Sequence, residues 1–99
     1  MIIYNVTVSV DHEIADDWLN WMRSKHIPDV MATGMFIENR LLRVVTGENS
    51  GSTFAVQYTC ESHERLENYQ TEFAPALQKD HLQRYGDKAV AFRTVLEIL

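Results

Sequence analysis

The sequence predicts an α+β sandwich, in which two strand–helix–strand units share a four-stranded antiparallel sheet and both helices cover the same face. Strand-like and helix-like patterns follow one another in the order βαββαβ. A glycine-containing segment of hairpin length separates the two halves. The whole pattern fits into 99 residues, which is enough for one domain, residues 1–99. Right-handed crossovers leave few other arrangements for these elements.

The first half begins with a strand over residues 2–10, where apolar and polar residues alternate as in a half-buried strand. A helix follows over about 13–26, because apolar residues recur there every fourth position. The recurring residues are Ile14, Trp18, Met22 and His26. Pro28 is expected to break this helix at His26–Pro28 and to open a short further turn.

A second strand is expected over about 35–46, although paired apolar residues at 41–42 and 44–45 blur its alternation. This blurring indicates either a β-bulge or burial of both strand faces. The loop 47–51 then leads into a third strand over 53–60. One face of that strand is apolar and carries Phe54, Val56, Tyr58 and Cys60.

Ser62 is expected to cap the second helix, and Gly86 is expected to end it. Pro75 lies inside the helical pattern and predicts a kink or a restart there. The apolar stripe of this helix consists of Leu66, Tyr69, Phe73, Leu77 and His81. A last strand follows over about 88–98. Its two faces differ, since Val90, Phe92, Thr94, Leu96 and Ile98 alternate with Ala91, Arg93, Val95 and Glu97.

Charge and composition exclude several classes of partner. The net charge is −5 and the basic residues are scattered, which argues against nucleic acid and against an anionic membrane surface. No apolar run approaches the roughly 20 residues of a spanning helix. The first ten residues lack the cationic start of a secretory signal, so a cytoplasmic protein is expected. The single cysteine, Cys60, permits no internal disulfide and is interpreted as a buried, inert thiol.

The sheet face away from the helices is expected to be polar, with mostly small side chains and few lysines. Its expected members are Asn5, Thr7, Gln57, Thr59, Ala91 and Arg93. Because a solvent-facing sheet normally carries more charge, one hypothesis is a homodimer that joins two such faces. The alternative is a plain exposed face.

Several stretches resemble a known family. They are residues 26–36 (HIPDVMATGMF), 72–77 (EFAPAL), His81, 84–86 (RYG) and 90–94 (VAFRT). The chain resembles an uncharacterised bacterial family of small ferredoxin-like proteins, a domain of unknown function within the dimeric α/β-barrel superfamily. That superfamily includes antibiotic-biosynthesis monooxygenases and stress-response domains. The resemblance spans the whole chain and implies the fold and a homodimer, but it supplies no reaction, and no monooxygenase catalytic residue has a matching motif here.

The two histidines on the apolar stripes, His26 and His81, are the main hints of chemistry. Such a histidine is most often a core residue, but an imidazole beside a pocket can act as an acid, a base or a ligand. The first helix is expected to run antiparallel to the first strand, which places His26 near Tyr4 and His63 at one end of the sandwich. His81 then lies near His12 at the other end. The sequence therefore predicts two separate pairs rather than one site.

The candidate catalytic residues are His26, Tyr4 and Tyr58, since both tyrosines share the inward sheet face near His26. The candidate pocket residues are Trp18, Trp21, His63, His81 and Arg93. The tryptophans are more often core or interface residues. The favoured interpretation of Arg93 is an ion pair with Glu97. On the presumed dimer face, however, Arg93 could instead hold a carboxylate of a partner chain or a ligand.

The leading hypothesis is a homodimeric small-molecule-binding or assembly module with a pocket between helices and sheet. The alternative is a small cofactor-independent enzyme, resembling the monooxygenases or isomerases of the superfamily. Metal-binding spacings such as H-x-x-x-H or C-x-x-C are lacking, and so are a serine elbow and a phosphate-binding loop. No metal or cofactor is therefore expected, although haem or metal binding stands as a third reading.

Overall fold

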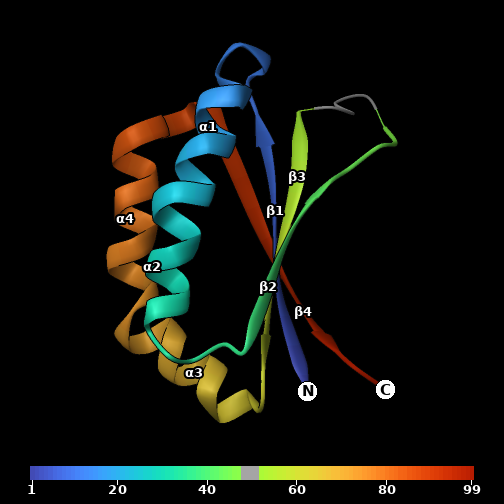
Figure 1. Cartoon of the computed structure of the whole chain (residues 1–99), viewed down its shortest axis with the longest axis vertical. Helices are drawn as coiled ribbons and strands as arrows, with labels where there is room; N and C mark the ends of the chain where they lie inside the picture. The colour runs from blue at the N-terminus through green and yellow to red at the C-terminus, as the bar shows by residue number, and fades with distance from the viewer. Residues whose placement is uncertain (48–51) are drawn as a thin grey trace.

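The computed structural model describes residues 1–47 and 52–99. Its elements follow the predicted βαββαβ order (Figure 1). In chain order they are β1 (Ile2–Val10), the 3-10 turn η1 (His12–Ile14), α1 (Ala15–Trp21), the π-helical turn η2 (Met22–His26), α2 (Ile27–Ala32), β2 (Glu38–Arg43), β3 (Thr53–Cys60), α3 (His63–Glu72), α4 (Ala74–Tyr85), the 3-10 turn η3 (Gly86–Lys88) and β4 (Ala89–Glu97). The predicted hairpin loop 47–51 lies outside the described residues from 48 onward.

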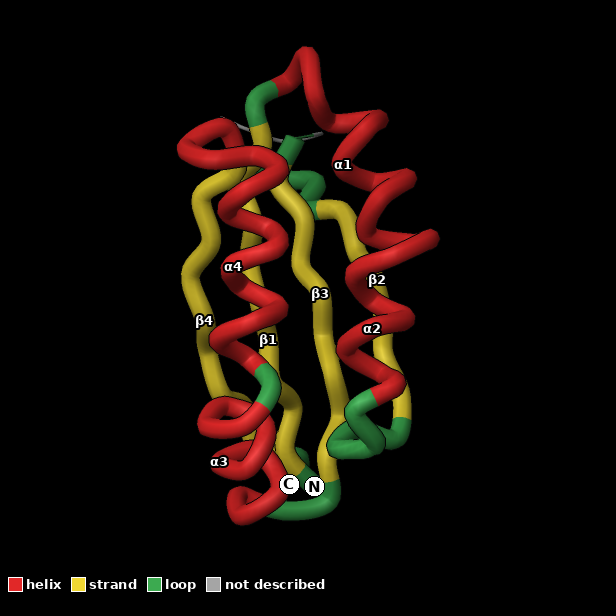
Figure 2. The backbone as a smooth tube through the Cα atoms, turned by 90° about the vertical axis from the view of Figure 1, so that its left-hand side faces the viewer, coloured by secondary structure: helices red, strands yellow, loops and turns green. Residues whose placement is uncertain are grey.

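The sheet has the strand order β2-β3-β1-β4, and each neighbouring pair is antiparallel. All helices lie on one face of it, with α4 over β1 and β4 and with α1 and α2 over β3 and β2 (Figure 2). The predicted ferredoxin-like sandwich is therefore confirmed. The opposite sheet face is left without a helix in the described part of the chain.

The first helical segment is longer than the sequence predicts. α1, η2 and α2 form a continuous helical course, and the backbone at His26 and Ile27 keeps right-handed helical dihedral angles. The expected break at His26–Pro28 is therefore wrong. Pro28 lies in the first turn of α2, directly after the π-helical turn. A wider turn relieves the clash between a proline ring and the carbonyl four residues earlier.

The second helical segment follows its sequence signals closely. The Ser62 hydroxyl accepts a hydrogen bond from the Arg65 backbone N–H at 3.2 Å, which confirms the predicted cap. α3 ends at Glu72 and α4 begins at Ala74, so the restart expected at Pro75 is confirmed. Gly86 ends α4 with φ of +57°, a backbone conformation that favours glycine.

β2 is shorter than expected, and its pairing with β3 runs without interruption from Glu38 to Arg43. No bulge therefore explains the paired leucines. Leu41 lies opposite the buried Val56 and packs against the core. Leu42 lies on the other face and remains 40% exposed. Each face of this edge strand carries one leucine among polar residues, and only Leu41 is partly buried.

The assignment of faces in β4 is the main correction to the predicted sheet. Arg93 lies directly opposite Val6, and Ala91 lies opposite the buried Val8. Because directly opposite residues share a face, Ala91 and Arg93 point toward the helices and not toward the outer face. The outer face of β4 carries Val90, Phe92 and Leu96, which are 63%, 62% and 40% exposed.

The core lies between the helices and the inner face of the sheet. Its centre is Trp18, which is fully buried and stacks on Phe54 with ring centroids 5.1 Å apart. Cys60 is buried as expected. In the described ranges, no helix is long and apolar enough to cross a membrane.

Candidate functional site

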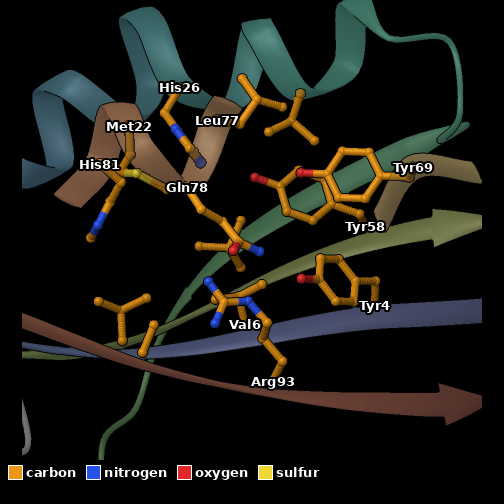
Figure 3. Close-up of a pocket in the computed structure, with 14 residues that line it drawn as sticks. Tyr4, Val6, Met22, His26, Tyr58, Tyr69, Leu77, Gln78, His81 and Arg93 are labelled. Atoms are coloured by element: carbon orange, nitrogen blue, oxygen red, sulfur yellow. The ribbon is translucent and has the colours of Figure 1, made fainter. Parts of the chain in front are cut away.

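A cavity of about 60 Å³ lies between the helices and the sheet (Figure 3). One ordered water needs roughly 10–15 Å³ of such space, so the cavity has room for several waters or for part of a small ligand. β1, β3 and β4 form its floor, while the helical elements from η2 to α4 form its other walls. Its polar lining consists of Tyr4, His26, Tyr58, Tyr69, Gln78, His81 and Arg93.

Three tyrosines from β1, β3 and α3 direct their hydroxyls to the same part of the cavity (Figure 3). Tyr4 lies 5.8 Å from Tyr69 and 6.4 Å from Tyr58, measured between ring centroids. Phe36 packs against all three rings at 4.8 to 6.2 Å and holds them in place. This aromatic wall fixes the positions of the hydroxyl groups.

The three hydroxyls are available to a ligand. In residues 1–47 and 52–99 no hydrogen bond joins the hydroxyl of Tyr4, Tyr58 or Tyr69 to another protein group. Burial raises the pKa of Tyr58 and of Tyr69 well above the usual range, and nearby tyrosines add to both effects. These two phenols are therefore neutral hydrogen-bond donors at physiological pH.

The structure brings His26 and His81 into one site, with ring centroids 5.9 Å apart. The prediction that they lie at opposite ends of the sandwich is wrong. Its cause is the helix boundary: the helical course continues to Ala32, so His26 lies within it and not at its end. The predicted partners lie elsewhere, since His63 is exposed at the start of α3 and His12 hydrogen-bonds to Ser52 at 2.9 Å.

Trp18 fixes the chemical state of His81. The indole N–H of Trp18 donates to Nε2 of His81 at 3.0 Å. Because an indole nitrogen only donates, Nε2 must accept, which assigns the neutral imidazole with its proton on Nδ1. Burial lowers the pKa of His81, and the positive charge of Arg93 lowers it further. The basic nitrogen of His81 is therefore occupied.

His26 is the second imidazole of the cavity and stays neutral for a different reason. Burial lowers its pKa to about 4, and the neighbouring His81 contributes in the same direction. Asp29 and Asp80 oppose this shift, while Lys25 adds to it. The ring packs on Trp21 with centroids 5.1 Å apart. At neutral pH, His26 offers the cavity one nitrogen that accepts and one that donates.

Arg93 brings the positive charge of the site. It enters the cavity from β4, and Gln78 of α4 lines the same cavity (Figure 3). Within the described residues Arg93 forms no ion pair, so the expected pair with Glu97 is wrong. The reason is the register of β4, which turns Arg93 into the cavity.

The two tryptophans predicted to line the pocket lie next to its histidines. Trp18 is a core residue that acts on the site through His81, and Trp21 packs against His26 and Tyr85. Sequence reasoning missed Tyr69 and Gln78. Tyr69 belongs to the apolar stripe of its helix, and only its hydroxyl could have marked it as a site residue. Nothing in the sequence marks Gln78 as one. Among the residues that the structure describes, no three His, Cys, Asp or Glu side chains gather as metal ligands would.

Comparison with known families decides the classification. Residues 1–99 match the family described as domain of unknown function (DUF4286). The chain belongs to the DUF4286 family. None of the curated proteins matches the sequence.

Solved structures of low sequence identity share the DUF4286 fold. An ethyl tert-butyl ether d (EthD) family protein from Bacillus halodurans is 15% identical, with a TM-score of 0.75 and complete coverage of both chains. MhuD from Mycobacterium tuberculosis, a haem degrader with two haems in its active site, is 19% identical with a TM-score of 0.73, covering 100% and 96% of the chains. SnoaB from Streptomyces nogalater, a cofactor-independent oxygenase, is 8% identical with a TM-score of 0.71, covering 99% and 92%. These similarities establish the dimeric α/β-barrel type of fold.

We expect acid to destabilise the protein through His26. Its pKa is 6.5 in the unfolded chain and about 4 in the fold, so the native state binds fewer protons between these values. The neutral His26 makes its full contribution to the free energy of unfolding above about pH 6.5. This contribution, about 3 kcal/mol in total, is lost as the pH falls through 4. Urea denaturation at several pH values measures this loss.

The variant His26→Gln should make that pH dependence shallower, and His81, whose pKa is also lowered by burial, should retain its own share. His63→Gln is the matched control, because His63 is exposed at the start of α3 and should leave the wild-type slope in place. Equal pH slopes for wild type and His26→Gln would show that His26 is not a buried neutral imidazole.

Proposed function

We propose that this protein is a homodimer that binds a small organic molecule in the cavity between its helices and its sheet. One observation carries the proposal: polar groups from three strands and the helical layer converge on one space, and three of them, the hydroxyls of Tyr4, Tyr58 and Tyr69, have no hydrogen-bond partner in the described protein. Protein interiors are close-packed, and buried polar groups are normally hydrogen-bonded. A set of rigid, unpartnered donors around a cavity is therefore typical of a binding site.

The lining also has the mixture that binding sites use. Apolar side chains supply contact area, and they include Val6, Met22, Val30 and Leu77. The tyrosines, His26 and Arg93 supply a few directed polar groups. Such a combination gives a ligand both affinity and orientation. The superfamily fold is compatible with this role, since the similar structure of MhuD holds two haems in its active site.

Proton transfer is the second candidate function, and the position of His26 in the same cavity as Tyr4 and Tyr58 favours it. A neutral imidazole can accept a proton from a bound carbon or oxygen acid, becoming an imidazolium while the ligand becomes an anion. Hydroxyls of Tyr4 and Tyr58 would then donate hydrogen bonds to the oxygen on which that negative charge develops. In this role His26 is the base, and the two tyrosines stabilise the product anion.

The outer sheet face supports the homodimer. In the described chain no helix covers it, and Val90, Phe92 and Leu96 expose large apolar side chains there. Exposed apolar patches of this kind mark interaction surfaces. The similar solved structures are dimeric α/β-barrel proteins, a class that typically forms dimers. A second copy of this chain is the occupant we propose.

Replacing Phe92 with Asp should weaken this dimer. Each copy would place a charge in an apolar interface, and the two-fold symmetry would impose the change twice. We expect at least a tenfold rise in the dissociation constant, about 1.4 kcal/mol, by analytical ultracentrifugation. Leu82→Asp is the control, because Leu82 is 64% exposed on α4, away from the sheet. A wild-type protein that is monomeric at micromolar concentration would contradict the dimer.

Phenol, a small uncharged probe, should bind in the cavity. In a heteronuclear NMR titration we expect saturable shifts concentrated on the lining residues, such as Gln78. Ala91→Leu should lower the affinity at least fivefold, because the larger side chain fills the cavity next to Arg93. Ala76→Leu, on the exposed side of α4, should leave binding unchanged. Shifts scattered over the surface and insensitive to Ala91→Leu would contradict the pocket.

A further inference from the structure

We propose that the cavity selects a small organic acid and binds its carboxylate between Arg93 and the tyrosine hydroxyls. This inference rests on the proposed function, because it names the class of ligand for the same cavity. Two properties of the lining support it. The only charge there is positive, and hydrogen-bond donors outnumber acceptors among the described lining residues.

The charge of the cavity is positive. Arg93 is the one charged residue of its lining, which contains no Asp or Glu among the described residues. Asp29 and Asp80 act on His26 through space but do not line the cavity. Both imidazoles are neutral at pH 7, one held by Trp18 and the other desolvated. An anion would therefore meet a complementary charge, whereas a cationic ligand would be repelled by Arg93.

The hydrogen-bonding groups favour the same choice. A guanidinium offers five N–H donors and no acceptor. The phenols of Tyr58 and Tyr69 remain protonated because burial raises their pKa, so each has a proton to donate. A carboxylate has two oxygens with about four acceptor positions and meets these donors well. Charge-assisted hydrogen bonds of this type are about twice as strong as neutral ones.

Other ligand classes leave groups without partners. A purely apolar ligand would cover the phenols and the guanidinium without bonding them, at a cost of about 1–3 kcal/mol for each buried group. A neutral amide has one acceptor oxygen instead of two and carries no negative charge, so it would satisfy fewer of the cavity's donors and would form no ion pair with Arg93. The shape of the lining agrees, because Arg93 lies on one side and apolar groups such as Met22 and Leu77 lie on the other (Figure 3).

Benzoate and benzamide form a matched pair of probes for this inference. They have almost the same shape and differ in charge and in donor count. Isothermal titration calorimetry at pH 7 should show benzoate binding at least tenfold more tightly than benzamide. Arg93→Gln should weaken benzoate binding about tenfold and leave benzamide binding nearly unchanged. Arg23→Gln removes an exposed cation on η2 outside the cavity and should change neither affinity.

The salt dependence of the wild-type protein gives an independent reading that does not depend on any variant. Raising the salt concentration should weaken benzoate binding and leave benzamide binding unaffected, because only the first involves an attraction between charges. If Arg93→Gln does not fold, this comparison still decides the matter.

The outcomes separate the two proposals. Benzamide binding as tightly as benzoate, with no effect of salt or of Arg93→Gln, would overturn the choice of an acid while leaving the pocket in place. Phenol binding without benzoate binding would have the same meaning. Failure of phenol, benzoate and benzamide alike would overturn the ligand-binding function itself, and with it the present inference.

Discussion

The indole of Trp18 links the two helical segments to the sheet through direct contacts. It is fully buried, stacks on Phe54 of β3 and donates its N–H to His81 of α4. This single side chain therefore fixes where α1 and α4 meet above the sheet. It also fixes the tautomer of His81, because the hydrogen bond occupies Nε2. His26 is consequently the imidazole of the cavity whose accepting nitrogen is not taken by Trp18. A packing interaction in the core thus determines which histidine is available for chemistry.

The polar groups of the cavity depend equally on strand register. Tyr4 lies beside Tyr58, and Val6 lies beside Arg93, because opposite residues of antiparallel strands share a face. A shift of β4 by one residue would turn Arg93 outward and bring an apolar side chain into the cavity. Phe36 then locks the tyrosine rings from the side. The strand pairing therefore places the positive charge of Arg93 and the hydroxyls of Tyr4 and Tyr58 on the same sheet face, without a ligand.

The order of elements could be predicted from the sequence because periods of two and of about 3.6 residues are local properties. The signals at Ser62, Pro75 and Gly86 were equally local and were confirmed. Register and helix packing are not local. Hydrophobicity alone places the apolar face of β4 inward, yet the structure turns Phe92 outward. Pro28 by itself predicts a helix break, although a π-helical turn accommodates it. Because of these two features, the sequence alone did not predict that His26, His81 and Arg93 line the same cavity.

The states of the two imidazoles and their response to an acid are the features on which the site depends most. A long-range ¹H–¹⁵N spectrum of the histidine rings at pH 7, recorded with and without benzoate, tests both together. It should show neutral imidazoles at His26 and His81, with the His81 proton on Nδ1. Benzoate should move the ring signals of His26 and leave the tautomer of His81 unchanged. A His81 proton on Nε2, or ring signals of His26 that do not respond to saturating benzoate, would contradict the account.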